Sequence, residues 1–120
     1  MAETDLKEKP KTGTERKKDD TLFCAACGAP VTRERFAVSE RGDHEHTVFN
    51  PAGRLFTIRC FSDAPGAVMM GRPTMEFTWF PGCAWQLAAC DACAAHLGWS
   101  YSGAARFFGL IKKAIKPSPS

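Results

Sequence analysis

Hydrophobic and polar residues alternate over several short runs of the chain, and turn residues separate these runs. Such alternation is typical of β-strands that have one face in solvent. The predicted strands are residues 21–23, 31–39, 47–49, 55–61, 75–80 and 96–102. A helical pattern is thin everywhere except at the end of the domain, in residues 107–115. The pattern therefore predicts an all-β domain made of two small antiparallel sheets.

Glycine and proline residues predict where the chain turns. Asn50-Pro51-Ala52-Gly53 separates two predicted strands, and these residue types favour a tight turn, so we expect a β-hairpin there. Residues 62–72 contain Pro65, Gly66 and Gly71 and predict a loop with few anchors and a mobile rim. Residues 41–46 predict a polar turn in which the histidines are solvated.

Composition divides the chain into a charged tail and one domain. Residues 1–20 hold six Lys or Arg, six Asp or Glu and one large aliphatic side chain, Leu6. A segment with so little apolar surface predicts disorder. All thirteen aromatic residues lie between Phe23 and Phe108. The predicted folded domain is therefore 21–116, followed by a short tail at 117–120.

Charge and hydropathy limit the classes of partner. The formal net charge is only +3, and the one basic cluster of the predicted domain is Lys112, Lys113 and Lys116, so a nucleic-acid partner is not expected. No apolar run approaches the roughly 20 residues of a membrane-spanning helix, and the first residues lack the apolar segment of a secretory signal. The expected location is cytoplasmic, without a membrane partner. In a reducing compartment, cysteines are more readily metal ligands or free thiols than disulfides.

Four of the six cysteines have the spacing of a metal site. Cys24-x-x-Cys27 and Cys90-x-x-Cys93 are two knuckles that can each bind a tetrahedral ion through two thiolates. The 62 residues between the knuckles predict that one structural Zn²⁺ joins the two ends of the domain. A redox dithiol or disulfides are the alternatives. Because four sulfurs leave no open position for water, hydrolytic zinc chemistry is not expected.

The other candidate ligands and thiols are assigned structural roles. His96 follows Cys93 by three residues, but four cysteines already complete the ion, so a partly buried structural histidine is expected. Cys60 alternates with core residues of its strand and is predicted to be buried. Cys83 follows Pro-Gly in a predicted loop and is a candidate reactive thiol.

All three tryptophans of the chain lie within 21 residues, at Trp79, Trp85 and Trp99. Trp79 and Trp85 flank a Pro-Gly turn and Trp99 follows the second knuckle, so a metal clamp brings the third indole to the other two. The three indoles are predicted to form a pocket, with an ordinary core as the alternative. Such walls suit a cation, such as a methylated ammonium group, or a small flat ring such as a cyclic imide. The residue types do not choose between these guests.

These motifs resemble a known family. The strings PTMEFTWFPGCAW and CDACAAHLGW, with CAACG and VFNPAGRLFTI upstream, are similar to the thalidomide-binding domain of the cereblon family, in its stand-alone bacterial form. The resemblance runs from about Phe23 to Ile115. It implies two antiparallel sheets that meet at an angle and are pinned by one zinc, a β-tent, and a cage for glutarimide. Because the resemblance covers this one domain, the other parts through which the animal protein joins a ubiquitin ligase are not expected in this chain.

The resemblance also implies roles for individual residues. Trp79, Trp85 and Trp99 correspond to the cage walls and Tyr101 to its base. The backbone at Phe77 and the indole N–H of Trp79 correspond to the groups that read the imide edge. Further positions that match the rim or its neighbours are Asn50, Pro51, Glu76 and Thr78. The implied guests are thalidomide-type molecules, uracil-like rings and C-terminal cyclic imides on damaged proteins.

Three positions depart from the animal pattern, and two other functions remain open. Phe77 stands where histidine is usual, Tyr101 where phenylalanine is usual, and Cys83 where tyrosine is usual beside the cage. The leading hypothesis is a binding module rather than an enzyme. The alternatives are an enzyme that resembles zinc-containing methionine sulfoxide reductases, with Cys60 or Cys83 as nucleophile, and an aromatic cage for methylated ammonium groups.

Overall fold

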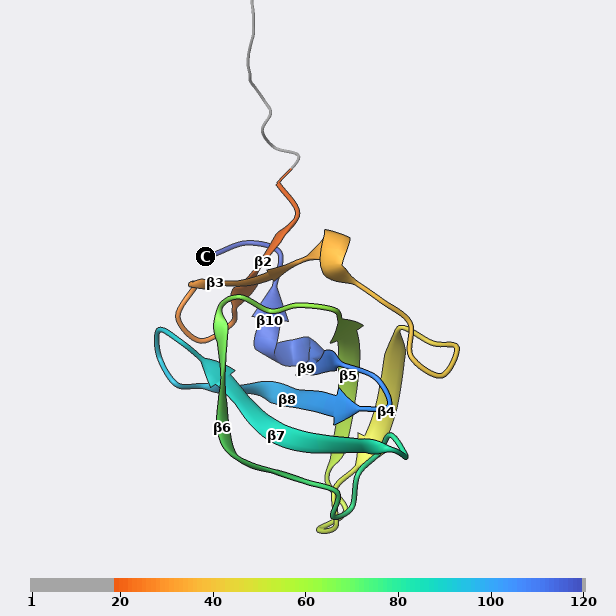
Figure 1. Cartoon of the computed structure of the whole chain (residues 1–120). Helices are drawn as coiled ribbons and strands as arrows, with labels where there is room; N and C mark the ends of the chain where they lie inside the picture. Colours follow the sequence, from red (N-terminus) through yellow and green to blue (C-terminus); the bar gives the residue numbers. More distant parts are fainter. Residues whose placement is uncertain (1–18, 120) are drawn as a thin grey trace, which may run out of the picture.

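The computed structural model describes residues 19–119, so almost all of the predicted charged tail lies outside the described residues. The described chain consists of β-strands, turns and two short 3₁₀-helices, arranged in two antiparallel sheets of three and six strands. The prediction of an all-β fold with two antiparallel sheets is confirmed. Figure 1 shows the small sheet seated on one end of the large one.

The small sheet has the strand order β10-β2-β3. Its members are β2 (Thr21–Cys24), β3 (Pro30–Arg33) and β10 (Ile115–Lys116), so it joins the beginning of the domain to its end. The predicted strand 31–39 is too long, because the 3₁₀-helix η2 (Glu34–Phe36) follows β3 directly. The Ala37 backbone N–H donates to the Glu34 carbonyl at 2.9 Å and closes this helical turn.

The large sheet has the strand order β4-β5-β9-β8-β7-β6. Its members are β4 (Glu45–Phe49), β5 (Leu55–Phe61), β6 (Ala67–Thr74), β7 (Cys83–Cys90), β8 (His96–Gly103) and β9 (Phe107–Ile111). A second 3₁₀-helix, η3 (Lys112–Ala114), connects β9 to β10 in place of the longer helical pattern expected there. The predicted hairpin is confirmed: β4 pairs with β5 from Glu45↔Arg59 to Phe49↔Leu55, and Gly53 donates to the Asn50 carbonyl in the turn.

For two neighbouring segments, the predicted loop is a strand and the predicted strand is a loop. Residues 62–72 were expected to be a loop, but β6 occupies 67–74 and pairs with β7 from Ala67↔Cys90 to Met70↔Leu87. Residues 75–80 were expected to be a strand, but they leave the sheet in turns, with a positive φ of 56° at Phe77. The bulky residues of this segment therefore serve a loop, and the glycine-containing segment serves an edge strand.

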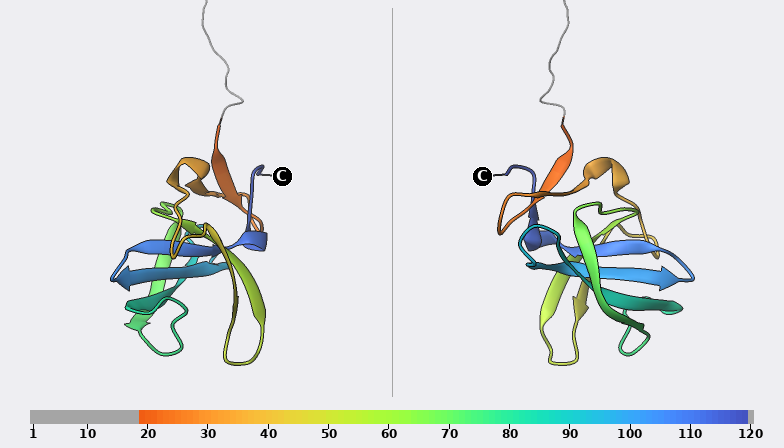
Figure 2. Two further views of the ribbon diagram at one scale, coloured as in Figure 1. Left: turned by 90° about the vertical axis from the view of Figure 1, so that its right-hand side faces the viewer. Right: turned by 60° about the vertical axis from the view of Figure 1, so that its left-hand side comes forward.

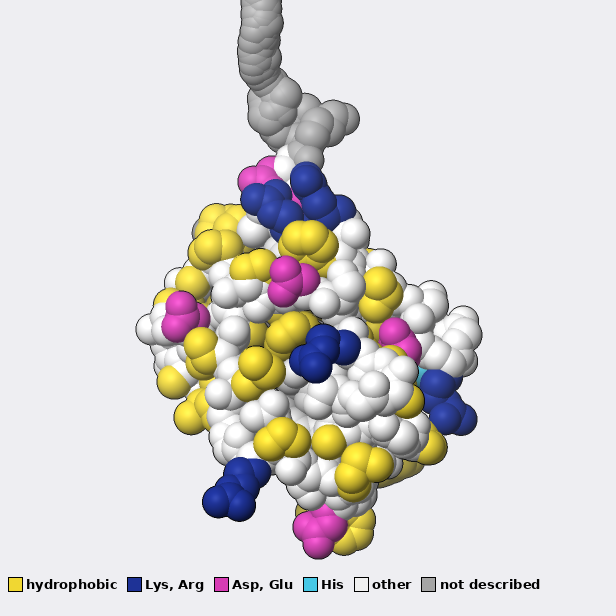
Figure 3. All heavy atoms as spheres, viewed as in Figure 1, with side chains coloured by type: hydrophobic (Ala, Val, Ile, Leu, Met, Phe, Trp, Pro, Cys, Tyr) yellow, Lys and Arg dark blue, Asp and Glu magenta, His cyan; other side chains and the backbone are white. Residues whose placement is uncertain are grey.

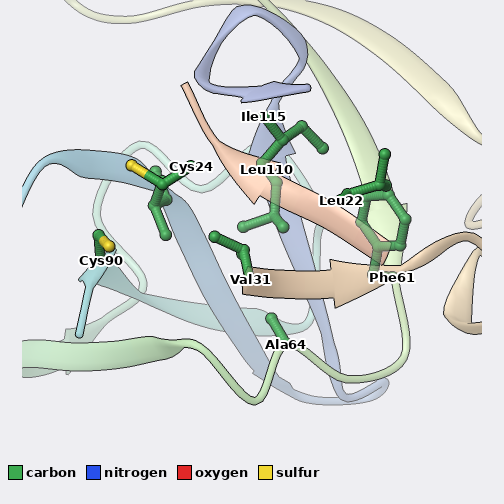
Figure 4. Packing of buried hydrophobic residues seen from close by; sticks show 9 residues of the cluster. Leu22, Cys24, Val31, Phe61, Ala64, Cys90, Leu110 and Ile115 are labelled. Atoms are coloured by element: carbon green, nitrogen blue, oxygen red, sulfur yellow. The ribbon is translucent and has the colours of Figure 1, made fainter. Parts of the chain in front are cut away.

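One hydrophobic cluster joins the two sheets. Leu22 and Val31 from the small sheet pack with Phe61 and Leu110 from the large sheet, as Figure 4 shows from close by. Leu97 of the large sheet belongs to the same cluster. Each of these side chains is buried. Two cysteines of the knuckles, described below, complete this cluster, so the packing between the sheets continues up to the sulfur atoms.

A second cluster lies in the large sheet away from the small sheet. It contains Ile58, Cys60, Phe80, Tyr101 and Phe107, with tryptophan side chains packed against it. Cys60 is fully buried, as predicted. Cys83 is also buried in this cluster at the first residue of β7, so the prediction of a loop thiol is wrong.

His44 lies in a packed polar network rather than in the predicted solvated turn. Its Nδ1 lies 2.9 Å from the Val38 carbonyl oxygen, and its Nε2 accepts a hydrogen bond from Arg59 Nε at 3.0 Å. The same guanidinium pairs with Glu34 at 2.6 Å and lies over the Phe61 ring at 5.0 Å. This network ties η2 to β5.

Gly66 lies where the small sheet, the following loop and the second knuckle meet. Its N–H donates to the Val31 carbonyl and its carbonyl accepts from the Asp91 N–H, both at 2.9 Å. A Cβ at this position would lie 2.0 Å from the Pro30 carbonyl oxygen. We expect Gly66→Ala to lower the free energy of unfolding by about 2–4 kcal/mol, because backbone must move apart. Urea denaturation measures this. For comparison, Gly53→Ala adds a Cβ that meets nothing within 4 Å and is expected to cost only the roughly 1–2 kcal/mol of an alanine at a φ of 83°.

Candidate functional site

The four predicted ligand cysteines lie together between the two sheets. Cys24 ends β2 and Cys90 ends β7, while Cys27 and Cys93 lie in the turns that follow. Their sulfur atoms all lie within 4.8 Å of one another, with Cys24–Cys93 at 3.8 Å and Cys27–Cys90 at 3.7 Å. A tetrahedral ion with metal–sulfur bonds near 2.3 Å requires sulfur–sulfur distances of about 3.8 Å. The geometry therefore fits a tetrahedral metal site.

The two knuckles have the same backbone hydrogen bonds. In the first, Cys24 N–H donates to the Ala29 carbonyl and Gly28 N–H donates to the Cys24 carbonyl, at 2.7 and 2.8 Å. In the second, Cys90 N–H donates to the Ala95 carbonyl and Ala94 N–H donates to the Cys90 carbonyl, both at 2.8 Å. The fifth residue of each turn has a positive φ, 81° at Gly28 and 65° at Ala94. Glycine adopts this conformation without strain, which is the reason for the CAACG pattern.

The pKa values of the thiols indicate that a cation is needed for all four to ionise. Burial opposes ionisation of Cys24, but the backbone N–H groups of Cys27 and Ala26 and the neighbouring thiols lower its pKa to about 7. The Ala95 N–H favours the Cys93 thiolate, yet burial and the three other sulfurs raise the pKa of Cys93 to about 12. Because the thiolates repel one another, all four ionise together only when a cation lies between them.

His96 is not part of the sulfur cluster. Its Nε2 lies 3.0 Å from the Gly98 carbonyl oxygen, and its ring packs edge-on against Trp99 at 4.9 Å. This placement agrees with a structural role, although the residue is exposed rather than partly buried.

The aromatic residues surround a cavity at the opposite end of the large sheet. Its volume is about 400 Å³. The lining residues come from the β4–β5 hairpin, the 75–82 loop and strands β7 and β8, and they are Asn50, Pro51, Glu76, Phe77, Trp79, Trp85, Trp99 and Tyr101. Figure 2 shows the hairpin and the loop projecting from the same end of the sheet, away from the small sheet.

Exposure increases steadily from the floor of this cavity to its rim. Tyr101 is 1% exposed, Trp99 is 7% exposed, Trp79 and Trp85 are half-buried, and Phe77 is 70% exposed. Alternation along β8 places Trp99 and Tyr101 on one face of the sheet, and Trp85 lies directly opposite Tyr101 on β7. The strands therefore supply the floor and the loop supplies the rim.

Hydrogen bonds fix two of the indole rings. Trp79 Nε1 donates to the Phe49 carbonyl at 2.6 Å, and Trp85 Nε1 donates to the Glu76 carbonyl at 2.7 Å. The first bond ties the loop to the hairpin, and the second ties the loop to β7. The rings of Trp79 and Trp99 meet at a right angle, with centroids 4.7 Å apart. The walls are thus held in place by the protein's own backbone.

Backbone groups at the rim are left without a protein partner. Among residues 19–119, neither the N–H nor the C=O of Phe77 makes a hydrogen bond, and the backbone N–H of Trp79 makes none. The positive φ of Phe77 separates this short segment from any regular strand. The rim therefore presents two donors and one acceptor close together.

One predicted residue lies outside the lining and one supporting residue was missed. Thr78 turns inward, where its hydroxyl donates to the Cys83 carbonyl at 2.8 Å and anchors the loop. Phe56 on β5 packs edge-on against Trp99 at 5.3 Å and tilted against Trp79 at 6.3 Å. The alternation of residues 55–61 predicted a strand, but only the pairing of β5 with β9 brings Phe56 near the tryptophans.

Another cavity, of about 420 Å³, lies beside the knuckles. It is lined by β3, Pro65, Gly66 and the second knuckle, and its charged members are Arg33 and Asp91. No aromatic residue lines it among the residues that the structure describes. The tryptophan-lined cavity is therefore the better candidate for recognition of a flat guest.

The comparisons with known proteins agree with the fold and the sulfur cluster. Residues 20–113 match the family described as "Yippee zinc-binding/DNA-binding /Mis18, centromere assembly". The chain is 35% identical over 107 residues to protein cereblon of Danio rerio, and 34% identical over 106 residues to that of Gallus gallus. These alignments cover 82% and 81% of this chain. The chain therefore belongs to the Yippee-Mis18 zinc-binding family, and its domain is of the cereblon type.

The similarity concerns one part of the larger relatives. The chain spans about a quarter of the length of these cereblon proteins, 25% for Danio rerio and 24% for Gallus gallus.

On the face shown in Figure 3, Lys and Arg side chains gather at one end of the domain and are isolated elsewhere. Within residues 19–119, no helix is long and apolar enough to cross a membrane.

Proposed function

We propose that the chain is a non-enzymatic binding module that captures cyclic-imide or uracil-like rings in a cage of Trp79, Trp85 and Trp99. The observation that carries the proposal is the combination of three converging indoles with unpartnered backbone groups at the cage rim. Apolar walls suit the faces of a flat ring, and a few polar groups at one edge fix its orientation. The guest is a free small molecule or a ring of this kind at the C-terminus of a modified protein.

The rim is complementary to an imide edge. That edge presents carbonyl, N–H and carbonyl in sequence, so it requires a donor, an acceptor and a donor. The Phe77 carbonyl can accept from the imide N–H, and the Trp79 backbone N–H can donate to one imide oxygen. The Trp79 indole N–H, which the resemblance assigns to this edge, is already donated to Phe49, so we assign the contact to the backbone N–H of the same residue.

One structural Zn²⁺ completes the module. Four cysteine sulfurs at tetrahedral spacing, in a chain of a zinc-binding family, support this ion over other divalent metals. When bound, it supplies a covalent-like link between the turn after β2 and the turn after β7. The cysteine side chains hold it with no position left for a substrate, so its contribution is to the fold.

The reductase alternative is weakened by the burial of its candidate nucleophiles. Cys60 is 0% exposed and Cys83 is 3% exposed, and neither lines the tryptophan cavity. Burial raises the pKa of Cys60 to about 12, which opposes formation of the thiolate that such chemistry needs. Because no cysteine lines the cavity among the described residues, the cavity favours ligand binding over thiol catalysis.

The experiment that tests the proposal is a titration of tryptophan fluorescence in the zinc-loaded chain with thalidomide and, separately, with uridine. We expect saturable quenching at micromolar concentrations, because a neutral ring of few heavy atoms stacks on the indoles. Absence of a response to both compounds would contradict the proposal. Quenching by tetramethylammonium alone would assign the cage to cations instead, with Glu76 at the rim as counter-ion.

A further inference from the structure

Strand β6 is an edge of the large sheet, and its outer side pairs with no strand among residues 19–119. Figure 1 shows it at the margin of that sheet. Natural edge strands are usually guarded against further pairing by charged residues, proline or a bulge. Residues 66–71 contain neither a charged residue nor proline, and the ladder with β7 stays regular from Ala67 to Met70 before its register shifts. This part of the edge is therefore open to a further strand.

The backbone at the centre of this edge points outward. The Asp91 N–H donates to the Gly66 carbonyl at 2.9 Å, and this bond flanks the register pair Ala67↔Cys90. In an antiparallel ladder such a bond flanks a pair that exchanges no hydrogen bonds itself, and the pattern alternates along the strand. The N–H and carbonyl of Met69 therefore point away from β7. They offer one donor and one acceptor to an added strand.

The exposed side chains of this edge are apolar on both faces of the sheet. Met70 lies opposite Leu87 of β7. Alternation places Val68 on the same face as these two residues and Met69 on the other face. All four side chains are exposed. An added strand would cover apolar surface on both faces, which favours its pairing.

Opposite charges lie at the two ends of the edge. Asp91 lies beside its first residues, through the bond to Gly66, and Arg72 follows its last. Both residues are exposed, and neither makes an ion pair in the part of the chain that the structure describes. A strand with the same charges in the reverse direction brings an acidic end to each basic end. A second copy of this chain, in antiparallel orientation, has this pattern.

We propose that β6 is a self-association edge, at which two copies of the chain pair antiparallel about a two-fold axis through Met69. The Met69 N–H of each copy donates to the Met69 carbonyl of the other, and Val68 of one copy lies opposite Met70 of the other. Arg72 of each copy then lies at the Asp91 end of the other. The proposal goes beyond the cage, since no residue of β6 lines the tryptophan cavity. One pair of edge strands buries less than the roughly 1,200 Å² of a stable interface, so the dimer is weak and reversible.

The first test is sedimentation velocity of the zinc-loaded full chain between about 1 µM and 1 mM, the range of weak complexes. We expect a reversible monomer–dimer equilibrium. Met69→Lys is expected to weaken the dimer by at least about tenfold, because two like charges then meet at the two-fold axis. Met75→Lys is the matched control, since Met75 is equally exposed, 53% against 54% for Met69, but lies outside β6. It is expected to leave the equilibrium unchanged.

A chain that stays monomeric throughout this range overturns the proposal and leaves the edge to strands of other proteins. A dimer that Met69→Lys does not weaken lies on another surface and also overturns it. Neither result bears on the proposed function, because the response of tryptophan fluorescence to thalidomide is measured separately on the same chain.

A charge exchange tests the antiparallel arrangement. Arg72→Glu alone and Asp91→Arg alone place like charges together at both ends of the dimer, and each is expected to weaken it by about three- to tenfold. An equal mixture of the two variants places opposite charges at both ends, so we expect the mixture to regain the affinity of the unaltered chain. Zinc content verifies that Asp91→Arg, next to Cys90, leaves the knuckle intact. A mixture that dimerises no better than either variant alone overturns the antiparallel pairing.

Discussion

Replacement of Cys90 by alanine is expected to unfold the domain. Cys90 is 2% exposed and belongs to the cluster that joins the two sheets, so its sulfur is part of both the candidate metal site and the core (Figure 4). No strand of either sheet is hydrogen-bonded to a strand of the other in the part of the chain that is described. The four cysteine sulfurs lie between the sheets, so an ion bound by them would tie the two sheets together.

The expected size of this effect follows from typical magnitudes. Structural zinc sites contribute about 10–16 kcal/mol of apparent binding free energy at neutral pH. A domain of this size has a net stability of roughly 5–15 kcal/mol, so loss of the ion removes most or all of it. Circular dichroism on heating, with metal analysis of the purified chain, measures the outcome.

Cys60→Ala is the matched control for this replacement. Cys60 is as deeply buried as Cys90 but lies outside the sulfur cluster, so its loss is expected to cost only about 1–2 kcal/mol and to leave one zinc per chain. A cooperative thermal transition of Cys90→Ala, at the temperature of the unaltered chain and without bound metal, would show that the ion is dispensable.

Trp99→Ala is expected to weaken binding of the imide ring by at least about thirtyfold. Trp99 is the deepest of the three indoles and contacts Trp79, Phe56 and His96. Removal of a central aromatic anchor typically costs 2 kcal/mol or more of binding free energy. Calorimetric titration with thalidomide measures the loss.

Truncation of a buried tryptophan also destabilises a fold, by about 3–5 kcal/mol. Trp99→Phe is therefore measured beside it, since a smaller aromatic wall keeps part of the stacking surface and the packing. Leu87→Ala is the matched control, because Leu87 lies directly opposite Trp99 on β7 but is exposed and does not line the cavity. Unchanged affinity in folded, zinc-loaded Trp99→Ala would refute the cage.

Local chemistry predicted part of the fold well. The Asn-Pro-x-Gly turn predicted the β4–β5 hairpin, and the two Cys-x-x-Cys motifs predicted the sulfur cluster, because each depends on residues close in sequence. The knuckles then needed only one long-range assumption, that a single ion takes ligands from both. The repeated backbone hydrogen bonds around Cys24 and Cys90 explain why short motifs are sufficient there.

The segment 67–80 could not be predicted from its own residues. Phe77 and Trp79 have the size and shape that favour strands, but they serve the cavity rather than a sheet face. Gly71 suggested a loop, yet Gly71 and Pro73 both lie on an edge strand, which tolerates such residues because one side makes no ladder. The bond from Trp79 to Phe49 joins residues 30 apart in sequence, and no local pattern contains it.

The shared strands of the two sites have a thermodynamic consequence. Strand β7 carries Cys90 at one end and Trp85 in its first half, while β8 follows the second knuckle and carries Trp99 and Tyr101. Under the proposed function, a change in the rigidity of these two strands therefore affects both the metal site and the cage. Thermodynamic linkage makes such coupling reciprocal. If a bound ion raises the affinity of the cage for its ligand by some factor, then a bound ligand raises the affinity of the cysteines for the ion by the same factor.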